Sequence, residues 1–163
     1  MTSPVLLRPA LPTEVDLLSA LALRSKGHWG YSAEFLDVCR AELTLRQSQV
    51  GDVTVAEVGA SDDGASDDGR WNVAGFVLLD GPAPSGELAM LFVDPPYIGL
   101  GIGRTLLDHA LAEGRRRGYA EVLLDADPDA AAFYRSQGAE VVGESPSGSV
   151  PGRVLPRMRF RLD

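Results

Sequence analysis

The amino-acid sequence predicts an α/β protein in which helices pack on a mixed β-sheet within a single domain, residues 1–163. Hydrophobic patterns with the spacing of strands and helices follow one another in the order strand, two helices, three strands, helix, strand, helix and two strands. The 163 residues suffice for one domain, and a composition of 45% hydrophobic and 23% charged residues is typical of a globular protein.

The first half of the chain is predicted to hold a strand, two helices and a second strand. A short apolar run at residues 5–7 predicts the first strand. Capping-box spacing at Thr13 opens a helix with leucines at helical intervals, and a second helix is expected over residues 32–43. Cys39, the only cysteine, is predicted to be a small core residue. The Val-rich residues 52–58 predict the second strand.

The second half continues with strands and helices. A nearly continuous apolar run at residues 71–79 is typical of a strand covered on both faces, and the next strand is expected at 87–93. Residues 101–118 carry one apolar stripe at helical spacing and end on Gly118. The remaining predicted elements are a strand at 122–124, a helix from 128 to about 137, and strands at 141–142 and 154–162, where Pro156 indicates an edge strand, a bulge or a late start.

The charge balance argues against nucleic acid as a partner. Fifteen Lys and Arg stand against 23 Asp and Glu, a net charge of -8, whereas affinity for nucleic acid comes largely from neutralising phosphates. Part of the acidity lies in residues 59–69, which are predicted to form a mobile hairpin loop. No apolar run is long enough to span a membrane, and residues 1–8 lack a secretion signal. We therefore expect a cytoplasmic protein that does not bind membranes.

The most informative stretch is the glycine-rich connection at residues 95–103, between a predicted strand and a predicted helix. Gly99, Gly101 and Gly103 stand at alternate positions. Such spacing lets successive backbone N–H groups turn toward one point, and the following helix directs its positive end there. A diphosphate suits this geometry. A tight turn without a ligand is the structural alternative, but it needs fewer glycines.

Two other phosphate-binding loops fit this stretch less well. A Walker loop needs Gly-Lys-Ser/Thr, whereas Arg104 and Thr105 follow the last glycine here. A Rossmann fingerprint needs Gly-x-Gly-x-x-Gly directly after the strand, and here the third glycine comes one position early. Asp125 would nonetheless lie near the place of a ribose-binding acid, so a dinucleotide binder stays open as a third hypothesis.

Taken together, these residues resemble the GNAT superfamily of acyl-CoA-dependent N-acyltransferases. Its central motif is a strand, Arg/Gln-x-x-Gly-x-Gly/Ala and a helix, which reads Ile98-Gly-Leu-Gly-Ile-Gly103 here, with Ile98 in place of Arg or Gln. The later motif Asn-x-x-Ala-x-x-Phe-Tyr-x-x-x-Gly resembles residues 127–138, with Asp127 in place of Asn. The resemblance covers residues 87–144 and implies a mostly antiparallel sheet of six to seven strands with four helices.

The resemblance also implies an activity and a cofactor site. The chain should transfer acetyl from acetyl-CoA to a primary amine of a small molecule or peptide, and the edge of the strand at 90–93 should pair with the pantetheine arm. A backbone N–H there should polarise the thioester carbonyl. Tyr134 corresponds to the tyrosine that often protonates the leaving thiolate; burial as an aromatic is its alternative. The expected cofactor-binding residues are Leu91, Phe92, Val93, Ile98, Gly99, Leu100, Gly101, Ile102, Gly103, Arg104, Thr105, Asp127 and Phe133.

Direct attack requires a base, because an alkylammonium ion must lose a proton before its nitrogen can act as a nucleophile. Glu87, at the start of the strand beside the cofactor, is the first candidate. Glu144 is the second. Glu87 has a solvated charge at the end of the strand as its alternative, and a water chain could serve in place of a carboxylate.

The acceptor pocket is expected between the two first helices, where the superfamily usually forms it. His28, Trp29 and Tyr31 lie in a dense cluster of polar and aromatic residues there, for which a tight helix–helix corner is the structural alternative. Arg153, in a Gly- and Ser-rich loop, could bind an acceptor carboxylate or be a surface charge. His109 has no predicted partner and is expected to be structural.

The leading hypothesis is therefore an N-acetyltransferase, and the alternative is a module that senses acyl-CoA without efficient catalysis. No metal is expected, because His, Cys and acidic residues show no ligand spacing. The predicted edge strand at 154–162 could pair with a second copy in a homodimer. The sequence does not identify the acceptor.

Overall fold

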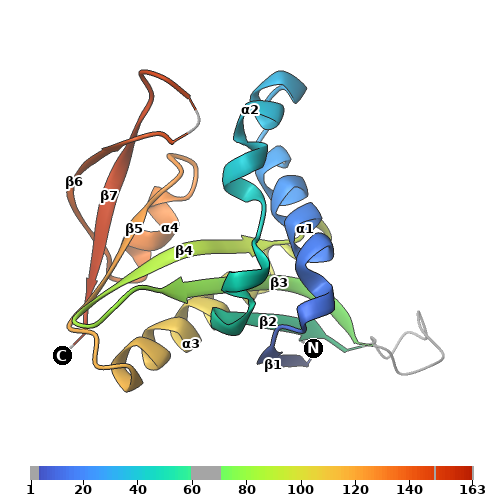
Figure 1. Cartoon of the computed structure of the whole chain (residues 1–163), viewed down its shortest axis with the longest axis horizontal. Helices are drawn as coiled ribbons and strands as arrows, with labels where there is room; N and C mark the ends of the chain where they lie inside the picture. Colours follow the sequence, from blue (N-terminus) through green and yellow to red (C-terminus); the bar gives the residue numbers. More distant parts are fainter. Residues whose placement is uncertain (1–3, 60–70, 149, 163) are drawn as a thin grey trace.

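One seven-stranded sheet with helices on both faces organises the computed structural model, which describes residues 4–59, 71–148 and 150–162 (Figure 1). The strands are β1 (Val5–Pro9), β2 (Val53–Val58), β3 (Asn72–Asp80), β4 (Ser85–Val93), β5 (Glu121–Asp125), β6 (Glu140–Pro146) and β7 (Val154–Arg161). The α-helices of the described residues are α1 (Val15–Gly27), α2 (Ala33–Leu43), α3 (Ile102–Arg116) and α4 (Ala131–Ser136). This is the predicted order of elements.

The sheet is mixed and mostly antiparallel, as predicted. Its strand order is β1-β2-β3-β4-β5-β7-β6, and β4 and β5 form the parallel pair. A Rossmann domain has a mostly parallel, doubly wound sheet. The dinucleotide-binding hypothesis is therefore wrong.

The last strand does not form the edge that its proline indicated. β7 pairs with β5 on one side and with β6 on the other, so β6 is the edge strand. Pairing with β5 begins at Arg157, directly after Pro156, so the missing N–H of the proline removes no hydrogen bond of that ladder. Of the three alternatives for residues 154–162, the edge strand is wrong, whereas the late start agrees with the pairing to β5 from Arg157 onward. Arg157–Arg159 are paired on both sides and offer no edge to a second copy.

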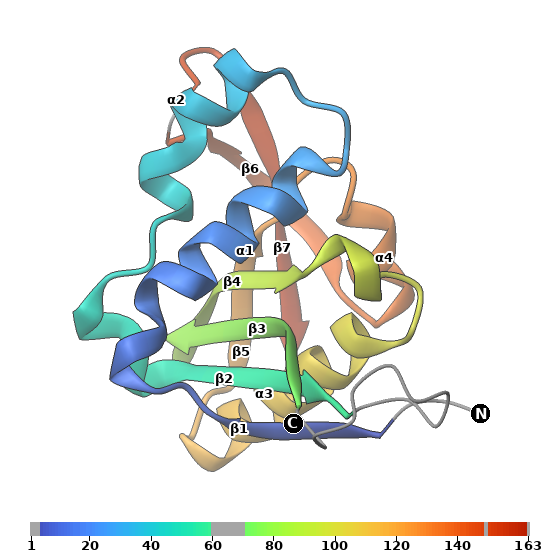
Figure 2. The same ribbon diagram turned by 90° about the vertical axis from the view of Figure 1, so that its right-hand side faces the viewer.

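Two hydrophobic cores lie on the two faces of the sheet, and β3 contributes to both. Val77 and Leu79 belong to the core that α3 covers, whereas Phe76 and Leu78 belong to the core under α1 and α2. The two views show these helices on opposite sides of the strands (Figure 2). The prediction that this strand is covered on both faces is confirmed. Cys39 is buried in the second core, also as predicted.

The start of the first helix differs from the prediction. A short 3-10 turn, Pro12–Glu14, precedes α1, and Thr13 caps nothing. The Glu14 carboxylate instead accepts a hydrogen bond from the Leu11 amide at 2.8 Å and pairs with Arg8 of β1 at 2.7 Å. The Glu14 carboxylate, held by Arg8, thus takes the place of the expected Thr13 cap. The predicted loop at 59–69 lies, except for Gly59, outside the described residues.

β4 and β5 pair over only three residues and then separate. Their parallel register covers Ser85–Gly86–Glu87, where Gly86 lies so close to the Tyr119 ring that a Cβ atom would collide with it. Beyond this junction the two strands diverge, with β4 continuing along β3 and β5 turning toward β7 (Figure 1). From Leu88 to Val93, β4 pairs with β3 on one side, but the edge that faces β5 has no strand beside it among the described residues. We call this the β4 edge.

Candidate functional site

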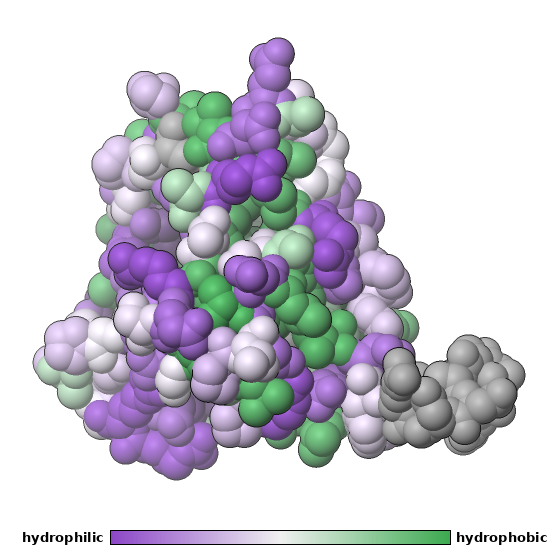
Figure 3. All heavy atoms as spheres, turned by 45° about the vertical axis from the view of Figure 1, so that its right-hand side comes forward, coloured by the Kyte–Doolittle hydropathy of each residue, from purple (hydrophilic) through white to green (hydrophobic). Residues whose placement is uncertain are grey.

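A groove of about 670 Å³ occupies the space between the separated strands. β4 forms one wall, β5 and α4 form the other, and residues of the glycine loop and of the last turns of α1 and α2 complete the lining. A space-filling view shows hydrophobic residues gathered on one face of the molecule and bordered by hydrophilic ones (Figure 3). The lining residues that the argument uses are Lys26, Trp29, Glu42, residues 88–93, Asp125, Asp127, Asp129, Phe133 and Tyr134.

The glycine loop has the conformation of an anion-binding site. Gly99 and Gly101 have φ of +89° and +81°, in the left-handed region that favours glycine, and Gly101 is the N-cap of α3. Gly103, in contrast, lies in the first helical turn. No described residue accepts a hydrogen bond from the backbone amides of residues 99–104. Several N–H donors are thus available at a helix N-terminus.

Tyr134 lies in α4 on the wall opposite β4. Its side chain is buried, its ring makes an edge contact with Phe133 at 5.3 Å, and it lines the groove. Burial, with a smaller contribution from the charge of Asp127, raises the pKa of the Tyr134 phenol well above its ordinary value. No hydrogen-bond partner for the hydroxyl is found in the part of the chain that the structure describes. A protonated hydroxyl is therefore available to a molecule in the groove.

Asp127 is the centre of a polar network that joins α1, the segment before α2 and the start of α4. Its carboxylate accepts a hydrogen bond from the Lys26 ammonium, and the Tyr31 hydroxyl lies 3.0 Å from it and 2.9 Å from Asp129. Arg153 donates to the Tyr31 hydroxyl at 3.2 Å. Burial alone would raise the pKa of Asp127, but the hydrogen bonds from Lys26, the Asp129 amide and Tyr31 outweigh burial and lower it.

The carboxylate of Glu87 is bound by an arginine. Both terminal nitrogens of Arg157 donate to it at 2.8 Å, and one of them also donates to Asp125 at 3.0 Å. Glu87 does not belong to the groove lining, although its neighbours Leu88 and Asp125 do. Glu144, the second predicted base, is exposed on β6 and does not line the groove either.

The sequence profile of the acetyltransferase (GNAT) family matches residues 31–139, more than half of the chain. The chain belongs to the GNAT family. A mycothiol acetyltransferase of Geodermatophilus obscurus is 46% identical over 50 residues, a match that covers 31% of this chain and 16% of that protein. This chain therefore matches only a small part of that relative.

Solved structures have the same fold over almost the whole chain. A GCN5-related N-acetyltransferase of Rhodopseudomonas palustris superimposes with a TM-score of 0.73 and 23% identity, covering 99% of this chain and 98% of that one. The PaiA N-acetyltransferase of Thermoplasma acidophilum, solved in complex with coenzyme A, gives a TM-score of 0.69 at 21% identity and covers 97% and 99% of the two chains. The expected GNAT fold is confirmed.

Most predicted GNAT cofactor residues line the groove. Leu91, Phe92, Val93, Ile98, Gly99, Gly101, Ile102, Gly103, Arg104, Asp127 and Phe133 do so, whereas Leu100 and Thr105 do not. Leu100 is 55% exposed, and the Thr105 hydroxyl donates to the Gly101 carbonyl at 3.0 Å. Neither difference affects the backbone amides, which are the groups expected to hold a phosphate.

The predicted acceptor residues are only partly brought together. Trp29 lines the groove. Tyr31 and Arg153 do not line it, but both interact with Asp127, which does. His28 is an exposed residue at the end of α1. The prediction missed Lys26, Glu42 and Asp129 as lining residues. Lys26 lay within the dense cluster of polar and aromatic residues, so composition could have pointed to it. Glu42 had no comparable signal, because it looks like any exposed helical acid.

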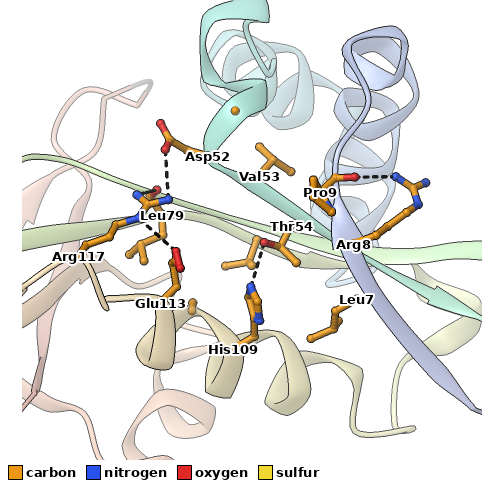
Figure 4. Close-up of a pocket in the computed structure, with 13 residues that line it drawn as sticks. Leu7, Arg8, Pro9, Asp52, Val53, Thr54, Leu79, His109, Glu113 and Arg117 are labelled. Atoms are coloured by element: carbon orange, nitrogen blue, oxygen red, sulfur yellow. Dashed lines mark hydrogen bonds and ion pairs between the residues drawn. The ribbon is translucent and has the colours of Figure 1, made fainter. Parts of the chain in front are cut away.

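A second, smaller cavity of about 280 Å³ lies on the α3 side of the sheet (Figure 4). His109 lies in it with its Nε2 3.2 Å from the Thr54 hydroxyl, and burial lowers the pKa of the imidazole. Arg117 pairs with Asp52 at 3.2 Å and with Glu113 at 3.7 Å. The polar side chains here bind one another, which agrees with a structural role for His109.

Two further findings concern residues 4–59, 71–148 and 150–162. No helix in these ranges is long and apolar enough to cross a membrane. No group of three or more His, Cys, Asp or Glu side chains in them is arranged to hold a metal ion.

Proposed function

We propose that this protein is an N-acetyltransferase that uses acetyl-CoA to acetylate a primary amine of a small molecule or peptide by direct attack. The observation that carries the proposal is the unpaired edge of β4 from Leu88 to Val93, which leads directly to the free amides of the glycine loop. An extended chain with a diphosphate at one end would form hydrogen bonds with both. Its carbonyl and amide groups would pair with the β4 edge, and its negative charge would bind at the helix N-terminus.

The residues of the groove fit coenzyme A at three points. The amides of residues 99–104 would hold the pyrophosphate, the β4 edge would hold the pantetheine arm, and the unpartnered Tyr134 hydroxyl would face the sulfur. The relative of known structure from Thermoplasma acidophilum was solved with coenzyme A and shares the fold, which supports this assignment. Acetyl-CoA supplies the activated acetyl group as a thioester.

The reaction converts an ammonium ion and a thioester into an amide, a thiol and a released proton. After deprotonation, the amine nitrogen forms the C–N bond with the acetyl carbonyl carbon, and the C–S bond breaks with its electron pair going to sulfur. In our proposal a backbone N–H of β4 stabilises the carbonyl oxygen, and Tyr134 donates its proton to the leaving sulfur. The second proton that the nitrogen loses as the amide forms returns to the Tyr134 oxygen and restores the phenol. The raised pKa of Tyr134 keeps the phenol protonated at neutral pH, as this role requires.

Substituting Tyr134→Phe tests the acid role. Removing one hydroxyl should lower kcat by about 10²-fold, the scale of one general acid. The Kd of coenzyme A, measured by calorimetry, should stay within about threefold, because the phosphate and pantetheine contacts come from the backbone. An unchanged kcat would contradict the role. A protein that only senses acyl-CoA would bind coenzyme A but show no amine-dependent thiol release in the wild type.

Substituting Glu87→Gln tests the proposed base. If Glu87 takes the proton directly or through a water molecule, kcat/KM should fall by about 10²-fold. Glu140→Gln is the matched control, because Glu140 also accepts hydrogen bonds from an arginine, Arg159, but lies on the edge strand β6 and not at the start of β4. Equal losses of kcat/KM in the two variants would show that Glu87 acts only through its ion pair with Arg157, and would contradict its role as a base.

A further inference from the structure

Ser25, in the last turn of α1, has a buried hydroxyl that the fold itself does not use. The residue is 7% exposed, and no other serine, threonine, amide or charged residue that the structure describes is buried to this degree. A serine in a helix usually bonds to the carbonyl four residues earlier, as Ser19 does with Val15 at 2.8 Å. The Ser25 hydroxyl has no hydrogen-bond partner in residues 4–59, 71–148 and 150–162. Because an unpaired buried hydroxyl lowers stability, the packing of α1 does not explain this serine.

Two ion pairs fix the direction of Ser25. Its neighbour Arg24 donates two hydrogen bonds of 3.0 Å to Asp94, which directly follows β4. Its other neighbour, Lys26, donates to Asp127, which lies between β5 and α4. Successive residues of a helix are turned by about 100° around its axis, so the Ser25 side chain leaves α1 between the pair to one wall and the pair to the other. Ser25 accordingly lines the groove.

Tyr134 contributes a second hydroxyl of this kind to the same groove. It is also 7% exposed and has no hydrogen-bond partner among the described residues. Tyr134 belongs to the core that α3 covers, whereas Leu21 and Ala22, one turn before Ser25, belong to the core under α1 and α2. The groove thus receives one unpaired hydroxyl from each side of the sheet.

The two sides offer different groups to the two substrates. The glycine loop leads into α3, so the amides proposed to hold the diphosphate lie at the helix of one side. Ser25 extends from α1 on the opposite side, away from this anchor of coenzyme A. The hydroxyl of Ser25 is therefore placed to meet the second substrate, the amine.

We propose that the Ser25 hydroxyl binds the reacting nitrogen of the acceptor. The inference rests on the acetyl transfer proposed above and adds a residue to it. Once the amine has lost its first proton, one N–H donates to the Ser25 oxygen, the lone pair points at the acetyl carbonyl carbon, and the other hydrogen is lost as the amide forms. A hydroxyl suits this step because it accepts a hydrogen bond without a negative charge that would stabilise the ammonium form.

Substituting Ser25→Ala tests the inference with butylamine as the probe. At saturating acetyl-CoA, kcat/KM for butylamine should fall by about tenfold, the scale of one lost hydrogen bond. The Kd of coenzyme A should stay within about threefold. The midpoint of urea unfolding should rise, because the variant removes an unpaired buried hydroxyl and alanine favours a helix. Lower activity together with higher stability is not expected of a serine that serves only the structure.

Ser19→Ala is the matched control in the same helix. The Ser19 hydroxyl donates to the Val15 carbonyl at 2.8 Å, accepts from the Leu45 amide at 2.9 Å and does not line the groove. The control should therefore lower the urea midpoint and leave kcat/KM for butylamine within about twofold. The two serines should thus change stability and activity in opposite patterns.

Calorimetry with butylamine in the presence of coenzyme A separates this inference from the proposed function. Binding that is about tenfold weaker in Ser25→Ala, without thiol release from acetyl-CoA in the wild type, would support the inference and refute the acetyl transfer. Unchanged kcat/KM and Kd for butylamine in the variant would overturn the inference, because the hydroxyl would then contact only water. A loss of affinity for coenzyme A alone, or no binding of butylamine to the wild type, would also overturn it.

Discussion

At the scale of single residues, Asp127 shows how one substitution changes a familiar motif. The later GNAT motif has Asn at this position. The charged carboxylate of Asp127 instead binds the Lys26 ammonium and the Tyr31 hydroxyl. An amide at this position would accept hydrogen bonds but would not pair with an ammonium ion. The charge of the carboxylate therefore links two segments that the neutral residue would hold less firmly.

Substituting Asp127→Asn should make the stability of the protein less dependent on pH. The folded protein lowers the pKa of Asp127, so its ionised form contributes stability above the unfolded pKa, about 3.9, and this contribution is lost as the pH falls through the lower folded value. Urea denaturation at pH 7 should show a loss of about 2 kcal/mol in the variant. The difference should shrink below pH about 4.

The control for that measurement is Asp37→Asn, because Asp37 is exposed and pairs with Arg40 of the same helix. Its effect should be within about 0.5 kcal/mol. A difference between wild type and Asp127→Asn that is the same at pH 3 and pH 7 would contradict the electrostatic explanation.

At the scale of elements, the glycine loop contains two kinds of glycine. Gly101 needs its positive φ to begin α3, whereas Gly103 is helical and a Cβ there would meet its nearest neighbours, Phe133 and Val93, at 3.7 Å. The first position therefore requires glycine for conformational reasons. The second requires only a small residue, in agreement with the Gly/Ala of the motif that it resembles.

The substitutions Gly101→Ala and Gly103→Ala should therefore differ. The first strains the backbone by about 1–2 kcal/mol and turns the amides away, so the affinity for coenzyme A should fall by about tenfold or more. The second should keep the affinity within about threefold, because its amides stay in place. Calorimetric titration with coenzyme A measures both. Equal losses of affinity would mean that any side chain added to the loop blocks coenzyme A, and would contradict the role of the backbone conformation at Gly101.

At the scale of the whole molecule, β3 joins the two hydrophobic cores. Its alternate side chains enter opposite cores, so neither face of the sheet can lose its packing without exposing the other side of the same strand. The described part of the chain is expected to unfold as one cooperative unit.

Truncating one leucine in each core tests this cooperativity. Leu18 and Leu107 are fully buried on opposite faces, and each change to Ala should cost about 2–5 kcal/mol. In both variants, circular dichroism and tryptophan fluorescence should report the same single transition in urea. Two separate transitions in either variant would show that the cores unfold independently.

The sequence by itself determined the order of the elements, the glycine loop and the position of Tyr134 in a helix after it. These features depend on local properties: the spacing of apolar side chains along one strand or helix, and the backbone freedom of single glycines. The central place of β7 in the sheet was not predictable from Pro156. The proline lacks an N–H group, but β5 begins to pair with β7 only at Arg157, so this ladder does not need that donor.

Only the tertiary structure decided how the charged residues around Asp127 and Glu87 are paired. The hydrogen bonds of Lys26 to Asp127, of Arg153 to Tyr31 and of Arg157 to Glu87 join residues 101, 122 and 70 positions apart. Which acid neutralises which cation depends on the meeting of separate segments in space, and a linear pattern of charges does not encode it. For that reason the sequence could name the loop expected to hold a diphosphate, but not the partners of Lys26, Arg153 and Arg157.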